Sequence, residues 1–107
     1  MLGPGGDRSA TMGSMADQKA ITAKITGRVQ GVGYRYTTVA MANELGLVGW
    51  VRNNPDGSVE TRAQGDERVL EQFVAFLEHG PRSARVRSVD VFPVAPDPSL
   101  RRFTVRS

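Results

Sequence analysis

Apolar and polar positions alternate strictly along an early stretch of the chain that begins at Ile21. Ile21, Ala23, Ile25 and Val29 fall on one side of an extended backbone, and the residues between them are polar or glycine. A period of two residues is typical of a strand that buries one face. The pattern therefore predicts a half-buried strand that leads toward a pair of closely spaced glycines.

After those glycines the apolar spacing changes to three and four residues. This spacing predicts a helix over residues 34–45, which Gly46 would end. Residues 47–53 are strand-like, and the Asn-Pro-Asp-Gly sequence at 54–57 is a strong turn signal. Alternate apolar positions resume from Val59, so the two runs are expected to form a hairpin.

A second helix is expected after Gly65, with Asp66 as its N-cap and an end at His79-Gly80-Pro81. Its apolar stripe has helical spacing and consists of Val69, Leu70, Phe73, Phe76 and Leu77. Residues 85–94 then predict a fourth strand, and residues 101–106 predict a short last one after a proline-rich connection.

The expected order is strand, helix, strand, strand, helix, strand, with a short fifth strand appended. Each helix has one apolar stripe and each strand has one apolar face, so two packed layers are required. The order predicts an α+β fold, a ferredoxin-like two-layer sandwich (βαββαβ plus a short fifth strand) with a mostly antiparallel sheet and two helices on one face. Enzymes, regulatory domains and RNA-binding modules share this architecture, so it does not identify the function.

Composition changes this picture only at the ends of the chain. With 107 residues and 39% hydrophobic side chains, the chain has material for one domain. Residues 1–18 show no period and are rich in glycine, which predicts a flexible N-terminal extension before a domain at 19–107. No cysteine is present and no apolar run has the length of a membrane span, so we expect a soluble, cytoplasmic protein without membrane partners.

The formal net charge of +3 favours anionic partners. The C-terminal quarter is rich in arginine, with Arg82, Arg85, Arg87, Arg101, Arg102 and Arg106. These residues fit either a nucleic-acid-binding surface or the solvated face and edge of a sheet. Because the central strands carry few aromatic residues for base stacking, we expect no nucleic-acid partner, and a monomer is the simplest assembly.

The segment from Gly27 to Arg35, here called the cradle, is the strongest candidate site. Its glycines let backbone N–H groups converge on one point, the following helix adds a partial positive charge, and the Arg35 guanidinium can grip two phosphate oxygens. The cradle therefore predicts a phosphate site. A glycine-rich turn with a surface arginine is an equally open interpretation at this point.

The remaining inventory of reactive residues is short. No Gly-Lys-Ser/Thr follows the cradle, and Tyr36 stands where a dinucleotide fingerprint needs its third glycine. His79 is the only histidine, and Asp56, Asp66 and Glu67 occupy turn and cap positions, so no metal site and no acid/base pair is expected.

Two asparagines at the end of the second strand need separate treatment. Asn54 begins the turn and is expected to cap it with its side chain. Asn53 shares a strand face with Val51 and has no such local role, so it is the better site candidate. The sequence alone does not show whether Asn53 reaches Arg35.

Two segments together resemble the paired signature of the acylphosphatase family: GRVQGVGYR at 27–35 and GLVGWVRNNPDGSV at 46–59. The resemblance implies hydrolysis of an acyl phosphate, a small-molecule substrate, to carboxylate and inorganic phosphate, with no metal and no organic cofactor. It implies that Arg35 binds the phosphate, that Asn53 positions water, and that the loop amides come from Gln30, Gly31, Val32, Gly33, Tyr34 and Arg35. Tyr34 stands where the family often has phenylalanine.

Elementary chemistry agrees with so sparse a site. An acyl phosphate expels a carboxylate whose conjugate acid has a pKa of about 4 to 5, so the leaving group needs no protonation near neutral pH. Two alternatives use the same ferredoxin-like fold. One is a non-catalytic phosphate-binding module in which Arg35 binds and Asn53 does nothing, and the other is a nucleic-acid-binding module that uses the C-terminal arginines.

Overall fold

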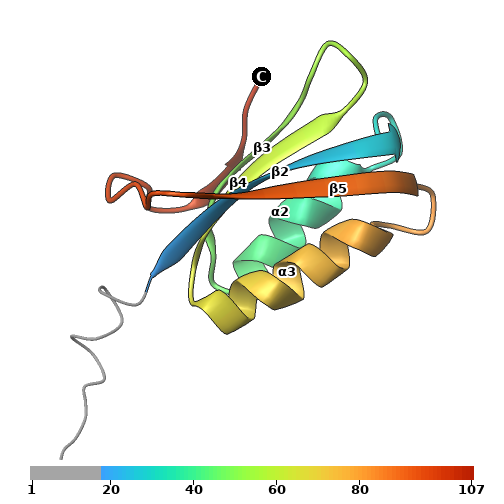
Figure 1. Ribbon diagram of the computed structural model, residues 1–107. Helices are drawn as coiled ribbons and strands as arrows, with labels where there is room; N and C mark the ends of the chain where they lie inside the picture. Colours follow the sequence, from blue (N-terminus) through green and yellow to red (C-terminus); the bar gives the residue numbers. More distant parts are fainter. Residues whose placement is uncertain (1–17) are drawn as a thin grey trace, which may run out of the picture.

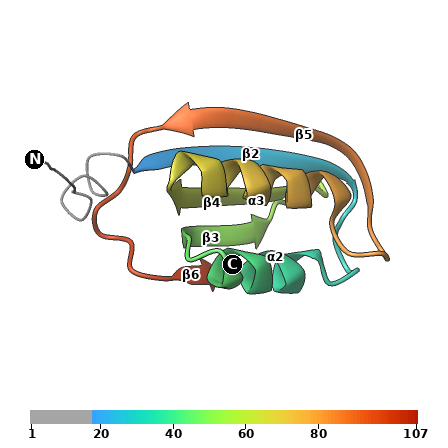
Figure 2. The same cartoon turned by 90° about the horizontal axis from the view of Figure 1, so that it is seen from below.

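A computed structural model describes residues 18–107 of the chain, so the expectation of a flexible extension at 1–18 falls almost entirely outside the described residues. Five strands form one sheet in the order β5-β2-β4-β3-β6, and all neighbours are antiparallel except β3 and β6. The strands are β2 (Lys19–Arg28), β3 (Val48–Asn53), β4 (Val59–Gly65), β5 (Arg85–Val94) and β6 (Phe103–Val105). Helices α2 (Tyr34–Glu44) and α3 (Glu67–His79) both cover one face of this sheet, which confirms the ferredoxin-like fold (Figures 1 and 2).

The directions of β2 and β3 decide where the site can form. Both strands pair antiparallel with β4, which lies between them, so they run in the same direction. Helix α2 connects the end of β2 to the start of β3. The carboxyl ends of β2 and β3 and the amino end of α2 therefore lie at the same end of the sheet (Figure 2).

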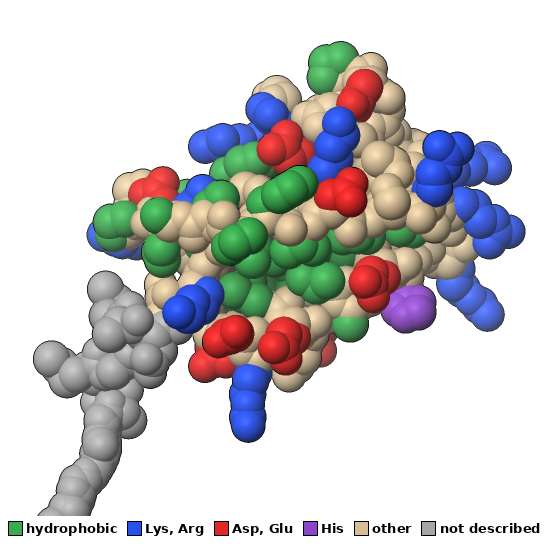
Figure 3. Space-filling view, viewed as in Figure 1, with side chains coloured by type: hydrophobic (Ala, Val, Ile, Leu, Met, Phe, Trp, Pro, Cys, Tyr) green, Lys and Arg blue, Asp and Glu red, His purple; other side chains and the backbone are tan. Residues whose placement is uncertain are grey.

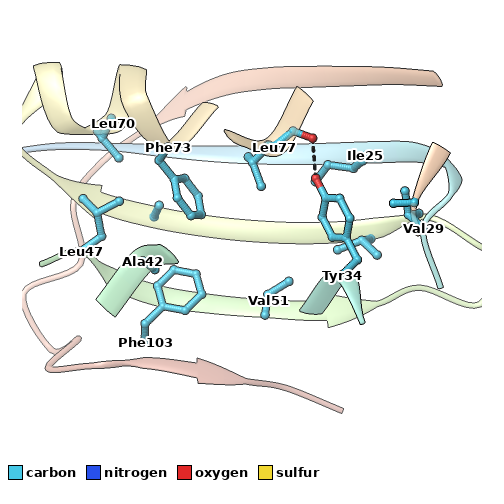
Figure 4. Close-up of a cluster of buried hydrophobic side chains, with 14 residues drawn as sticks. Ile25, Val29, Tyr34, Ala42, Leu47, Val51, Leu70, Phe73, Leu77 and Phe103 are labelled. Atoms are coloured by element: carbon cyan, nitrogen blue, oxygen red, sulfur yellow. Dashed lines mark hydrogen bonds between the residues drawn. The ribbon is translucent and has the colours of Figure 1, made fainter. Parts of the chain in front are cut away.

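The core lies between the helices and the sheet (Figure 4). Three residues of α3 with helical spacing are buried, namely Leu70, Phe73 and Leu77, as the apolar stripe predicted. Phe73 meets Phe103 of β6 edge to face, with ring centroids 5.9 Å apart. Because Phe73 is completely buried, this contact joins α3 to the far edge of the sheet, where β6 extends the pairing of β3.

The helix ends follow the expected local chemistry. The Asp66 carboxylate accepts a hydrogen bond from the Arg68 N–H at 2.8 Å, which confirms the N-cap of α3. Helix α2 ends at Glu44, and Gly46 then adopts a φ of 74°, as expected of a glycine stop.

The last strand is shorter than residues 101–106, the range the alternation predicted. The connection from β5 crosses the end of the sheet, and Gln64 of β4 holds it there. The Gln64 amide donates to the Asp97 carbonyl and accepts from the Asp97 N–H, both at 2.8 Å. Strand pairing with β3 therefore begins only at Phe103.

Candidate active site

The cradle owes its path to glycines in unusual backbone conformations. At Gly27, where the pairing of β2 with β5 shifts register, φ is 125° and a Cβ atom would lie 2.1 Å from the Arg85 carbonyl oxygen. Gly31 and Gly33 have φ values of 75° and 83°, in the left-handed region, with open space around them. The first glycine therefore permits a close approach, and the other two permit the turn itself.

The amino end of α2 is left open. Its N-cap is Gly33, which provides no side-chain hydrogen bond, and its first turn carries no acidic residue. A helix amino end usually satisfies its free N–H groups with a capping side chain or a nearby carboxylate. Here Arg35 instead adds a cation to the positive end of the helix dipole. Both features are unfavourable unless an anion binds, which favours the phosphate-site interpretation of the cradle.

Arg35 and Asn53 lie at the same pocket, which has a volume of about 270 Å³. Its lining consists of Val29, Gly31, Gly33, Tyr34, Arg35, Tyr36, Asn53 and Val105. The structure thus brings the two principal site candidates together, at the end of the sheet where β2 and β3 both terminate. Larger hollows, of about 600, 630 and 420 Å³, lie elsewhere on the described residues and contain neither of them.

The side-chain oxygen of Asn53 is in an unusual position. Asn53 Oδ1 is buried and accepts no hydrogen bond from any residue of the described chain. An unsatisfied buried acceptor costs about 1 to 3 kcal/mol, so such atoms are rare in structural positions. Asn53 Oδ1 is therefore available to accept a hydrogen bond from a molecule that enters the pocket.

Gln30 and Val32 do not line the pocket, although the sequence placed both among the substrate-binding residues. The Gln30 side chain turns to the hairpin, where Nε2 donates to the Asn54 and Ser58 carbonyls, both at 2.8 Å. The Val32 carbonyl accepts a hydrogen bond from the Ser83 hydroxyl at 2.6 Å. These contacts tie the cradle to the turn that follows Asn53 and to the segment after α3.

The turn after Asn53 uses its polar residues internally. Asn54 Nδ2 donates to Ser58 Oγ at 3.0 Å, and Asp56 Oδ1 accepts from the Ser58 hydroxyl and N–H at 2.6 and 2.9 Å. These bonds, with a 3.0 Å ion pair to Lys24, hold the pKa of the Asp56 carboxyl below its ordinary value. Asn54 and Asp56 therefore have the structural roles that the turn sequence predicted.

Tyr34 fixes the amino end of α2 against the carboxyl end of α3. Its ring is 1% exposed, and its hydroxyl donates to the Leu77 carbonyl at 2.6 Å (Figure 4). In a helix the Leu77 carbonyl would accept from residue 81, but that residue is proline and has no N–H. Burial raises the pKa of the Tyr34 hydroxyl, so it remains a proton donor.

We expect Tyr34→Phe to lower the free energy of unfolding by about 1 to 3 kcal/mol, because the Leu77 carbonyl loses its partner in a buried position. Thermal or urea unfolding measures this loss. Tyr36→Phe is the matched control, because the Tyr36 side chain is exposed, and it should change stability by less than about 0.5 kcal/mol. Equal stability of the two variants would show that the hydrogen bond contributes nothing.

Basic side chains surround this end of the molecule. Arg28 of β2 and Arg85 of β5 stand directly opposite each other. Together with Arg87 they line the hollow of about 600 Å³. Figure 3 shows Lys and Arg side chains gathered where β2 ends and β5 begins. Like charges that face each other across a strand pair are destabilising. Because these arginines lie next to the cradle, they give this end of the molecule a positive potential that attracts anionic substrates.

Three lining residues were not expected from the sequence: Val29, Tyr36 and Val105. The alternation assigned Val29 to the core face of the first strand, and the helical spacing assigned Tyr36 to the first predicted helix. Val105 shares a predicted strand face with Phe103. No sequence signal showed that β6 pairs with β3, which is what brings Val105 to the pocket.

Comparison with known proteins decides the family. The acylphosphatase family model matches residues 21–105, which is most of the chain. The chain belongs to the acylphosphatase family. As a member of that family it is an enzyme that hydrolyses acyl phosphates to carboxylate and inorganic phosphate.

Curated relatives agree with this membership. The enzyme is 47% identical to an acylphosphatase of Lactobacillus johnsonii over 88 residues, which are 81% of this chain and 97% of the relative. It is 52% identical to an acylphosphatase of Acaryochloris marina over 71 residues, 66% of this chain and 76% of the relative. An acylphosphatase structure from Coxiella burnetii superposes with a TM-score of 0.80 at 34% identity, covering 87% of this chain and 97% of that one.

Proposed function

We propose that the enzyme holds the phosphoryl group of an acyl phosphate with the amides of residues 30–35 and a bidentate Arg35, and that Asn53 orients the attacking water. The observation that carries this proposal is the buried Oδ1 of Asn53, which has no hydrogen-bond partner among residues 18–107 and lies at the same pocket as Arg35. A buried acceptor opposite a phosphate site can direct a water molecule toward phosphorus in line with the leaving carboxylate.

The step needs little further help. The P–O bond to the acyl group breaks as the water oxygen bonds to phosphorus, and the leaving carboxylate departs without a proton. The proton of the water passes to a phosphate oxygen of the substrate. The loop amides and Arg35 stabilise the charge on the equatorial oxygens, which is where phosphoryl transfer most needs stabilisation.

Gln30 acts in this proposal as a positioning residue. Its two hydrogen bonds to the Asn54 and Ser58 carbonyls join the cradle to the turn that holds Asn53. We expect Gln30→Ala to lower kcat by roughly tenfold with little change in KM, because water would be misaligned while the phosphate contacts remain. Initial-rate kinetics measure kcat and KM separately. Gln72→Ala, at an exposed position on α3, is the matched control, and wild-type kcat in Gln30→Ala would exclude the positioning role.

Substrate selectivity tests the proposed chemistry as a whole. Within the described residues, the lining of the pocket contains no carboxyl group and no histidine to protonate a poor leaving group, so benzoyl phosphate should be hydrolysed and glycerol phosphate should not. Phosphate release from both is to be measured with chelator present and no added metal. Comparable rates on the two substrates would show that a general acid operates in this site.

We further propose that residues 19–107 form the catalytic domain of a monomeric, cytoplasmic enzyme without nucleic-acid or membrane partners. The open face of the sheet supports the exclusion of nucleic acid. On the central strands of that face the one large ring, Trp50, is covered by the guanidinium groups of Arg106 and Arg52, 4.7 and 5.5 Å from the ring centroid. The other exposed ring of this face, Phe92, lies on the edge strand β5. Within residues 18–107, no helix combines the length and apolar character needed to cross a membrane.

A further inference from the structure

The pocket at Arg35 and Asn53 has an apolar mouth. Tyr36 is 79% exposed and Val105 is 50% exposed, whereas Val29 and Tyr34 of the same lining are each 1% exposed. The exposed pair therefore lies at the opening and the buried pair lies at the floor. Among the large apolar side chains of residues 18–107, only Val91 and Phe92 are comparably exposed.

Two segments far apart in sequence produce this mouth. Tyr36 belongs to the first turn of α2, directly after Arg35, and it takes no part in the hydrophobic core. Val105 lies in β6 opposite Val51, on the face of the sheet that the helices cover. An isolated exposed apolar side chain needs no explanation, but two that converge on a catalytic pocket indicate a surface that a ligand covers.

The mouth also lacks charge. Arg35 is the one charged residue in the pocket lining formed by the described part of the chain, and the function proposed above assigns it to the phosphoryl group. Arg106, next to Val105, is turned to the opposite face of the sheet and stacks on Trp50. A charged acyl chain would therefore leave water at this opening without gaining an ion pair.

We propose that Tyr36 and Val105 form an acyl-group subsite that selects apolar, uncharged and preferably aromatic acyl groups. The subsite rests on the function proposed above, because it requires the phosphoryl group to occupy the cradle. With phosphorus held there, the acyl group extends toward the opening, where an aromatic acyl group packs against the Tyr36 ring and the Val105 methyl groups. The ring of Tyr36, and not its hydroxyl, carries the preference.

The test compares kcat/KM for benzoyl phosphate and acetyl phosphate, two substrates with the same reacting group. Tyr36→Ser and Val105→Ser should each lower the benzoyl-to-acetyl ratio by roughly two- to tenfold, through KM for benzoyl phosphate. The double variant should lose more, and hydrolysis of acetyl phosphate should fall less than hydrolysis of benzoyl phosphate, because a methyl group makes fewer contacts with these side chains. Tyr36→Phe should keep the wild-type ratio. Phe92→Ser, which removes an exposed ring from the far edge strand, is the matched control.

Three outcomes separate the possibilities. A wild-type ratio in the double variant would overturn the subsite while the proposed function stands. Equal losses on both substrates would also overturn it, since Tyr36 and Val105 would then serve the phosphoryl group or the fold. A failure of the proposed function would give a different result, because an Arg35 variant would then still hydrolyse both substrates.

Discussion

Replacing Arg35 with lysine is expected to lower kcat/KM for benzoyl phosphate by about 100-fold or more, although the positive charge is kept. The guanidinium is a planar fork that donates to two phosphate oxygens at once, whereas an ammonium is a point charge. Arg35 lies in the first turn of a helix with an open amino end, and in the proposed mechanism its donors and the loop amides bind the same phosphoryl group. Initial-rate kinetics with benzoyl phosphate measure the loss.

Arg68→Lys provides the matched control for this substitution. Arg68 is exposed, lies in the first turn of α3 and does not line the pocket, so activity should stay within about twofold of wild type. Thermal unfolding of both variants separates a folding defect from a catalytic one. An Arg35→Lys enzyme with near-normal turnover would remove the bidentate contact from the mechanism.

Asn53→Ala is expected to lower kcat by about 100-fold or more while the affinity for inorganic phosphate stays within roughly threefold of wild type. The substitution removes the buried Oδ1 atom that has no partner within the described chain and leaves the cradle intact. In the proposed mechanism turnover needs an oriented water, whereas phosphate binding needs only the amides and Arg35. Kinetics on benzoyl phosphate and product inhibition by phosphate measure the two quantities separately.

Asn43→Ala, at an exposed position on α2, controls for the loss of an asparagine side chain elsewhere. It should leave both turnover and phosphate affinity unchanged. If Asn53→Ala lost phosphate affinity in proportion to turnover, Asn53 would be a phosphate ligand, and another group would have to orient the water.

Most of the fold could be predicted because its periodicities are local. Alternation placed Ile25 and Val59 on the buried face of their strands, and helical spacing placed Phe73 toward the sheet. The length of β6 could not be predicted, because it depends on how Gln64 holds the connection from β5 at Asp97. Contacts between residues distant in sequence leave no period in the chain.

The candidate site could likewise be predicted only in part. The cradle glycines and Arg35 could be found from local chemistry. A turn with positive φ needs glycines, and a cation at the amino end of a helix is typical of an anion site. The approach of Asn53 to Arg35 could not, because it depends on β4 lying between β2 and β3. The hydrogen bonds of the Gln30 side chain and the apolar mouth at Tyr36 and Val105 likewise depend on three-dimensional neighbours.

The direction of water attack is the most direct test of the mechanism, because Arg35 and Asn53 are both assigned to a displacement at phosphorus. Benzoyl phosphate should be hydrolysed by the wild-type enzyme in water enriched in oxygen-18, and mass spectrometry of both products then locates the label. We expect one labelled oxygen in inorganic phosphate and none in benzoate. Label in benzoate would mean that water attacks the acyl carbon, and would contradict a site built to activate the phosphoryl group.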